Sequence, residues 1–131
     1  MRAEATLPNM NPFWASTKNR YVPNMCQGIT HIPQSIVRGD VRYGFDDLVF
    51  YDTDGLAGVL TYFPQDIPDT PDELGYEGGT YTISVDPAKQ RRGIGTALIK
   101  EMSRRWSVDF ENQTYSDAGL ALVKAFIKAG R

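Results

Sequence analysis

The spacing of apolar and polar residues predicts a β-hairpin in the middle of the chain. Apolar runs at residues 48–51 and 56–63 flank the tetrapeptide Asp52-Thr53-Asp54-Gly55. Asp-Gly between two apolar runs is a strong local signal for a hairpin turn, because both residues tolerate the backbone angles that such turns require. We therefore expect two adjacent antiparallel strands here.

The next part of the chain is predicted to form a strand that leads into a helix. Residues 80–85 alternate and are rich in β-branched side chains, and Pro87 ends this strand because proline cannot donate to a ladder. From Ile94 to Arg105, apolar residues recur at helical spacing, so one face of this helix is expected to point at a core. The apolar residues of this pattern are Ile94, Ala97, Leu98, Met102 and Trp106.

One more strand and a final helix are predicted near the end of the sequence. Residues 106–110 alternate, with Trp106, Val108 and Phe110 on one face. Ser116 or Asp117 is suited to cap the helix that follows. This helix is apolar on most sides, so we expect more than one neighbour to bury it.

Two segments show little periodic pattern. Prolines and asparagines are scattered through residues 1–45, where we expect irregular chain with a short helix near residues 34–37, after Pro33. Residues 64–79 are rich in proline, glycine and acidic side chains and are too polar to bury, so we expect a long loop. This loop is either the rim of an acceptor site or a disordered insertion.

Length and composition indicate one globular domain. The 131 residues suffice for a single core, and 41% hydrophobic and 23% charged residues are ordinary globular values. Cys26 is the only cysteine, and with His31 it forms no ligand cluster, so we expect neither a disulfide nor a metal site. No apolar stretch approaches the roughly 20 residues of a membrane span. Without a signal-peptide pattern, a cytoplasmic location is expected.

Charge is unevenly distributed along the chain. Residues 40–86 carry eleven acidic side chains against Arg42 alone, whereas residues 87–131 carry nine basic and four acidic ones. A negative middle would suit a cationic partner, and a positive end would suit a phosphate-rich cofactor. The alternative is that these charges only keep the surface soluble.

The basic turn between the predicted strand and helix has the chemistry of an anion site. The first N–H groups of a helix lack intrahelical partners, and the helix dipole places partial positive charge there. Gly93 and Gly95 would let a bulky anion approach the backbone, and Arg91 and Arg92 add full charges. Such a helix start can bind phosphate or pyrophosphate. The Walker pattern is absent, and Gly-x-Gly alone is no dinucleotide fingerprint.

This segment resembles the pyrophosphate loop of the GNAT superfamily of acyl-CoA-dependent N-acyltransferases. The resemblance lies in Val85-Asp86-Pro87 followed by Gln90-Arg91-Arg92-Gly93-Ile94-Gly95, and it covers the strand, the turn and the start of the helix. It implies an α/β (α+β) fold with a mixed, mostly antiparallel central sheet flanked by helices. The single domain would comprise an irregular N-terminal part, 1–45, and a cofactor-binding core, 46–131.

The resemblance also implies an activity and a cofactor site. It suggests that an acetyl group passes from acetyl-CoA to a primary amine of a small molecule or a protein. The strand would pair with the pantetheine amides, and the Val85 N–H would polarise the thioester carbonyl. The cofactor-binding residues would be Ile83, Val85, Gln90, Arg91, Arg92, Gly93, Ile94, Gly95, Thr96 and Ser116.

Catalytic residues are harder to assign. An amine needs a base or a water chain to lose its proton, and Glu77, Tyr81 and Ser84 flank the strand as candidates. Family members often carry a tyrosine that protonates the departing thiolate, but Val123 stands at that position. A thiolate can also leave unaided. The alternative to an active enzyme is therefore a catalytically weak acyl-CoA-binding or regulatory protein.

The end of the sequence departs from the family as well. A typical member has two more strands after the last helix, and this sequence stops at Arg131, so the fold is expected to be shortened there. The apolar helix face would need cover, either from a second copy in a homodimer or from the N-terminal 45 residues. Nucleic acid is not an expected partner, because the basic residues cluster at the turn and lack interleaved aromatics.

Overall fold

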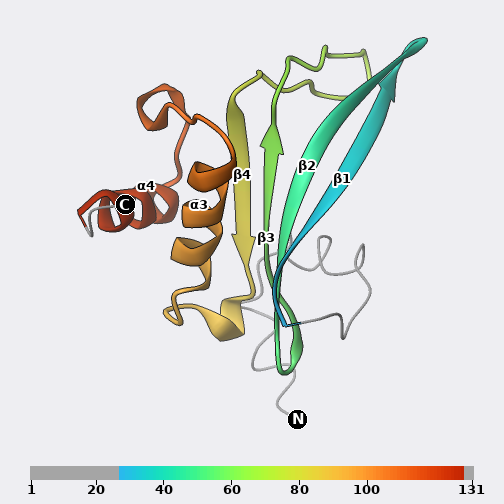
Figure 1. The fold of residues 1–131 in the computed structure, drawn as a ribbon. Coiled ribbons are helices and arrows are strands. Elements are labelled where there is room, and N and C mark those ends of the chain that lie inside the picture. Colours follow the sequence, from blue (N-terminus) through green and yellow to red (C-terminus); the bar gives the residue numbers. More distant parts are fainter. Residues whose placement is uncertain (1–26, 129–131) are drawn as a thin grey trace.

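The computed structural model describes residues 27–128, and its centre is one antiparallel sheet whose strand order follows the chain, β1-β2-β3-β4 (Figure 1). Two helices and two short 3-10 turns follow the sheet in the sequence. The architecture is therefore mixed, with an α+β organisation. The strands are β1 (Gly28–Arg38), β2 (Val41–Asp52), β3 (Gly55–Phe63) and β4 (Thr80–Val85). The remaining elements are η2 (Pro87–Lys89), α3 (Ile94–Arg105), η3 (Phe110–Asn112) and α4 (Asp117–Lys128).

The predicted hairpin is confirmed as β2 and β3. Asp52 pairs with Gly55 across the turn, and the Asp52 carboxylate accepts the Asp54 N–H at 2.8 Å. The register shifts at Phe50/Tyr51, because Phe50 pairs with Gly58 but Tyr51 pairs with Leu56, so β3 carries Ala57 as the extra residue of a bulge. Every residue of β3 is buried, because this strand lies inside the sheet and both of its faces are covered.

The prediction of irregular chain in residues 1–45 is wrong for the part of this segment that the structure describes. Residues 28–38 form β1 instead of irregular chain with a helix near 34–37, and β2 begins at Val41. The turn is Gly39-Asp40, with Gly39 at φ 62, a two-residue hairpin connection. Pro33 is tolerated because β1 is an edge strand of the described sheet. Residues 1–26, including Cys26, lie outside the described residues.

The predicted strand at 106–110 is also wrong. Among the described residues no strand pairs with β4 on its outer side, and residues 106–109 run without ladder bonds into η3. Trp106 stacks on Tyr62 with ring centroids 4.6 Å apart, so its apolar side chain covers the sheet without pairing with it. A side chain links the segment after η3 to the residue before β4, because Gln113 Nε2 donates to the Gly79 carbonyl at 2.9 Å.

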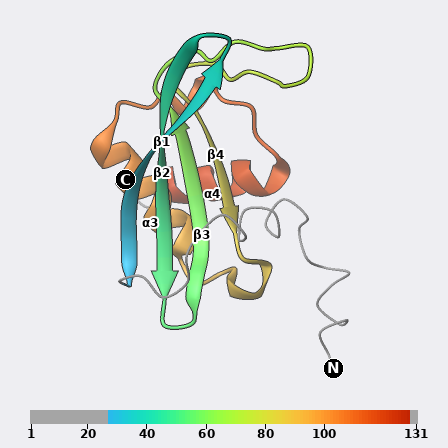
Figure 2. The same cartoon turned by 90° about the vertical axis from the view of Figure 1, so that its right-hand side faces the viewer.

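Both helices lie on the same face of the sheet (Figure 2). Side chains alternate between the two faces of each strand, so Leu48 and Leu60 meet Leu98 and Met102 of α3 in one cluster. On the opposite face, a smaller cluster is formed by Val49, Tyr51, Leu56 and Val59.

The positions of the two helices were predicted correctly, but α4 is less buried than expected. α3 buries the expected face, and α4 begins at Asp117 with Ser116 as its cap, since Ser116 Oγ accepts the Gly119 N–H at 3.1 Å. Within one chain α4 is covered less than expected, because Val123 and Phe126 are its only buried residues. Neither helix of the described region has the length and apolarity to cross a membrane.

The acidic segment 64–79 is a loop with internal order. Ile67 and Tyr76 form an isolated antiparallel bridge, and their backbone groups exchange two hydrogen bonds of 2.8 Å. Tyr76 stacks on Phe63 with centroids 4.0 Å apart, which ties the loop to the end of β3. The loop lies at the same end of the molecule as the β1–β2 turn (Figure 1).

Candidate functional site

The free edge of β4 is the first component of the candidate site. Asp86 N–H donates to the Ala57 carbonyl at 2.8 Å, and bonding alternates along an antiparallel strand. The N–H groups of Ser84 and Thr82 therefore face β3, whereas those of Val85 and Ile83 point away from it. With no described strand on that side, these two donors are oriented for a ligand that pairs as a strand does.

The turn after β4 is held in place by its own polar groups. The Asp86 carboxylate accepts the Ala88 N–H at 2.9 Å and so caps η2. Lys89 is buried, and its Nζ binds Asp52 Oδ1 at 2.9 Å, which ties the turn to the β2–β3 hairpin. This Lys89 hydrogen bond is the main cause that lowers the pKa of Asp52 below its ordinary value, with smaller contributions that include the Asp54 N–H and the nearby Arg92.

The start of α3 has the backbone of an anion site. Arg91 and Gly93 both have left-handed backbone angles, at φ 66 and φ 79. Gly93 is the N-cap and provides no side-chain hydrogen bond, so the first N–H groups of α3 have no side-chain cap. Gln90, Arg91, Arg92 and Gly93 are all exposed. A phosphate could reach these groups from solvent.

The two glycines of the turn have different roles. A Cβ at Gly93 would meet nothing within 4 Å, so Gly93 is required only for its left-handed angle. A Cβ at Gly95 would lie 2.8 Å from Leu122 Cδ2 of α4, and Gly95 is buried. The expectation that Gly95 leaves room for an anion is therefore replaced by a packing role, because Gly95 lets α4 approach α3 closely.

Four of the remaining predicted cofactor residues lie in β4 or in the first turn of α3. Ile83 and Val85 are half-buried on the α3 side of β4, Ile94 is buried and Thr96 is half-buried in the first turn of α3. Ser116 Oγ accepts the Gly119 N–H as the cap of α4, and its O–H is still able to donate. Val123 is 3% exposed and has no proton to donate.

The three catalytic candidates are not brought together. Ser84 is 6% exposed and lies opposite Val59, on the face away from α3, and its Oγ has no partner among the described residues. Tyr81 is on the α3 face. Burial, and then a hydrogen bond to Tyr115, raise the pKa of Tyr81, so it stays protonated and is a poor base. Glu77 is an exposed loop residue.

A histidine that the sequence gave no reason to single out has an ordered environment. His31 Nε2 lies 2.7 Å from Asp46 Oδ1, and Arg105 Nη1 lies 3.5 Å from His31 Nδ1. Because arginine only donates, Nδ1 accepts and Nε2–H donates to Asp46. His31 is on β1, three strands from the β4 edge, or about 14 Å by strand spacing. It is therefore no base for that edge. If the sequence had been interpreted as a hairpin with its turn at Gly39-Asp40, His31 would have been predicted to lie near Asp46.

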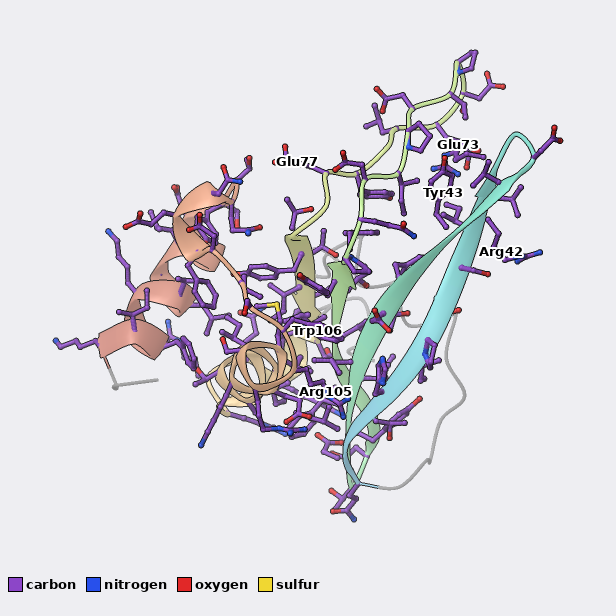
Figure 3. All side chains as sticks on the ribbon, turned by 45° about the horizontal axis from the view of Figure 1, so that its top comes forward. Arg42, Tyr43, Glu73, Glu77, Arg105 and Trp106 are labelled. Carbon is purple, nitrogen blue, oxygen red and sulfur yellow. The ribbon has the colours of Figure 1, made fainter. Side chains whose placement is uncertain are left out.

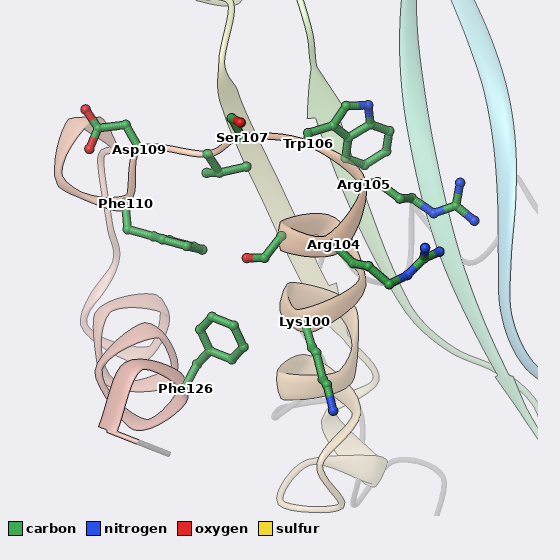
Figure 4. A pocket seen from close by; sticks show the side chains of 10 residues that line it. Lys100, Arg104, Arg105, Trp106, Ser107, Asp109, Phe110 and Phe126 are labelled. Carbon is green, nitrogen blue, oxygen red and sulfur yellow. The ribbon is translucent and has the colours of Figure 1, made fainter. Parts of the chain in front are cut away.

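A cavity of about 850 Å³ lies at the other end of α3 from the basic turn. Figure 4 shows Phe110 and Phe126 on one side of it and α3 on the other, with the guanidinium groups of Arg104 and Arg105 directed away from the two rings. The Ser103 hydroxyl lines this cavity and has no partner in the described part of the chain. The cavity contains none of the predicted cofactor residues.

No group of three or more histidine, cysteine, aspartate or glutamate side chains in residues 27–128 is arranged to hold a metal ion. Comparison of the chain with family models, curated proteins and solved structures found no match. The resemblance to the acyltransferase superfamily is thus carried by the strand, the turn and the helix of residues 83–99.

Proposed function

We propose that this chain binds an acyl-coenzyme A along the free edge of β4, with its pyrophosphate at the start of α3, and transfers an acetyl group to a cationic primary amine. One observation carries the proposal: an unpaired strand edge runs directly into a basic turn and a helix start without a side-chain cap. The order of strand, turn and helix agrees with a GNAT-like fold, which we propose as the finer fold assignment.

The ligand would be held by three kinds of contact. The outward N–H groups of Ile83 and Val85 would both pair with the pantetheine amides, as an added strand does. Val85, which lies next to the basic turn, would thus bind pantetheine and would not polarise the thioester carbonyl. Backbone N–H groups at the start of α3 would bind the pyrophosphate, with Arg91 and Arg92 supplying charge. β4 runs away from the acidic loop 64–79 towards the basic turn (Figure 1), so the thioester would point towards the acidic loop. A cationic amine would be attracted to that side.

The transfer itself would make one bond and break one. The amine nitrogen attacks the thioester carbonyl, the C–N bond forms, the C–S bond breaks and the thiolate leaves. An alkyl amine has a pKa near ~10.4, so it must lose a proton to a base or to water before attack. A thiol with a pKa near ~8.5 can leave as thiolate. The reaction therefore does not require a proton donor at the position of Val123.

The first test is acetyl-CoA binding by calorimetry. Arg91→Asn combined with Arg92→Gln should weaken binding about 100-fold, because two charged hydrogen bonds of about 1.5 kcal/mol each are lost. Asparagine tolerates the left-handed angle at position 91. The matched control is Lys124→Gln with Lys128→Gln, which removes the same charge from exposed positions of α4 and should leave binding unchanged.

Absence of binding by the folded wild-type protein at millimolar acetyl-CoA would refute the proposal. A second candidate function, acyl-CoA binding without transfer, is favoured by the separation of Glu77, Tyr81 and Ser84 and by the buried Val123. Release of the coenzyme A thiol in the presence of polyamines or lysine peptides separates the two. Thiol release above the rate without amine supports transfer, and binding without release supports the second function.

A further inference from the structure

The end of the molecule formed by the β1–β2 turn and the loop 64–79 exposes apolar side chains. Leu74 is 82% exposed, which is the largest value among the exposed large hydrophobic residues of the described chain, and Val41 is also exposed. Pro68 and Pro71 are exposed in the same loop. Figure 3 shows Arg42, Tyr43 and Glu73 together at this end, far from Arg105 and Trp106.

The loop that presents Leu74 is built around a buried arginine. The Arg38 side chain is 4% exposed, and its guanidinium donates to the carbonyls of Pro68 and Leu74, each at 3.1 Å. Glu73 adds an ion pair at 3.6 Å. A buried charge is costly unless such partners satisfy it, so these bonds hold the loop in one conformation. Val41 lies directly opposite Arg38 in the strand register.

Close backbone contacts hold the loop further. A Cβ at Gly75 would collide with the Ile67 carbonyl oxygen, and a Cβ at Gly78 would lie 2.9 Å from the Gln65 backbone. The Asp69 carboxylate accepts the Gly75 N–H, and Asp66 accepts the Gly78 N–H at 2.7 Å. Leu74 is therefore fixed at its backbone while its side chain points into solvent. Because the backbone is already held, binding at Leu74 does not require the loop to be ordered, which favours its use as an anchor.

Acidic side chains share this end of the molecule with Leu74. Asp69, Asp72 and Glu73 are exposed in the same loop, and Asp40 is exposed in the neighbouring turn. The nearby basic residue Arg42 donates a hydrogen bond to Ser35 Oγ at 2.9 Å. We call Val41, Leu74, Asp69, Asp72 and Glu73 the Leu74 surface. Its charge is complementary to a cationic partner, and its centre is apolar.

We propose that the Leu74 surface is a docking site for a basic peptide segment that carries an apolar side chain. The apolar residue contacts Leu74, and flanking lysines or arginines pair with the acidic rim. A second copy of this chain fits less well. Its exposed basic groups lie mainly on the basic turn, α3 and α4, so the contact would be head-to-tail and would give rings or open chains. Docking does not depend on acyl transfer, and it is measured without acetyl-CoA.

The experiment uses a fluorescein-labelled peptide of lysine and glycine with one central leucine. Fluorescence anisotropy should show saturable binding to the full chain at low salt, weakening as salt rises. Leu74→Ser should reduce affinity about 10-fold, as for the central residue of a small interface. Leu120→Ser, which replaces an exposed leucine of α4, should leave affinity unchanged.

Two further peptides make the result specific. Replacing the central leucine by serine should weaken binding as much as Leu74→Ser does, and replacing the lysines by glutamates should abolish it. Leu74→Ser should unfold at the wild-type temperature, because its side chain is exposed. The proposal is overturned if no peptide binds, if Leu74→Ser binds like the wild type, or if the protein alone forms growing chains that Leu74→Ser abolishes.

Discussion

Gly93 and Gly95 occupy neighbouring positions in the basic turn, yet the structure requires glycine at each for a different reason. Gly93 has a left-handed backbone and open space around its Cα. Gly95 has an ordinary helical backbone and Leu122 against it. A sequence pattern that contains both cannot separate a conformational from a packing requirement, because the second depends on a helix that begins more than twenty residues later.

We predict different stability effects for the two alanine substitutions. Gly93→Ala should cost about 1–2 kcal/mol in free energy of unfolding, because alanine is strained at positive φ. Gly95→Ala should cost about 1 kcal/mol or less, because crowding of Leu122 is partly offset by better helix propensity. Urea unfolding of both variants, each with and without Leu122→Ala, measures this.

The double-mutant cycle decides the cause. Gly95→Ala should couple to Leu122→Ala by about 0.5 kcal/mol or more, since shortening Leu122 removes the crowding. Gly93→Ala should show no coupling. Equal coupling at both positions would contradict the separate roles.

The Asp52–Lys89 pair should make the basic turn sensitive to acid. Because the pKa of Asp52 is lowered in the folded protein, its stabilisation is fully present above the ordinary aspartate pKa and is lost as pH falls through the lowered value. Asp52→Asn should reduce the free energy of unfolding at neutral pH by about 1–2 kcal/mol. The difference from the wild type should shrink below about pH 4.

Asp54→Asn is the matched control, since Asp54 is an exposed aspartate of the same turn. It should change stability little at neutral pH, because its side chain is exposed. Chemical unfolding curves recorded from neutral to acidic pH provide the comparison, and a difference for Asp52→Asn that does not depend on pH would exclude an ionic role.

Local signals predicted some elements well. Asp54-Gly55 marked the β2–β3 turn, Pro87 marked the end of β4, and the spacing from Ile94 marked α3. β1 was missed because Pro33 was interpreted as a helix start, although an edge strand tolerates proline. Residues 106–110 have the alternation of a strand, but pairing is a tertiary property, and Trp106 instead packs on Tyr62.

Only the part of the candidate site that is formed by contiguous residues could be predicted from the sequence. The basic turn and the helix start follow from contiguous residues, whereas the catalytic candidates depend on side-chain direction. Ser84 and Tyr81 are three residues apart in one strand, so they point to opposite faces. The environment of His31 arises from Asp46 and Arg105, which are distant in sequence and meet only when the sheet and α3 assemble.

At the scale of the whole molecule, α4 has an outer face that the described chain does not cover. Leu120 and Ile127 are exposed, with Ile127 at 46%. The cavity beside Phe110 and Phe126 opens near the same helix (Figure 4). An exposed apolar helix face beside a cavity is typical of an interface.

We therefore predict a homodimer through the α4 face. Ile127→Glu should shift the molar mass measured by light scattering from dimer to monomer at micromolar concentration, because it buries a charge in an apolar contact. Leu74→Glu is the control, since it changes an exposed apolar residue at the other end and should leave the dimer intact. A monodisperse wild-type monomer would reject the prediction, and acetyl-CoA binding should persist in Ile127→Glu.

The agreement between strand order and chain order has a consequence for how the sheet forms. Each strand pairs with the one synthesised before it, so hairpins can be added in sequence with short loop closures for β1–β2 and β2–β3. β4 joins only after the 64–79 segment closes, and this is the longest closure within the sheet. We therefore expect formation of the Arg38-centred loop to limit the folding rate. α3 can then cover β3 and β4 together.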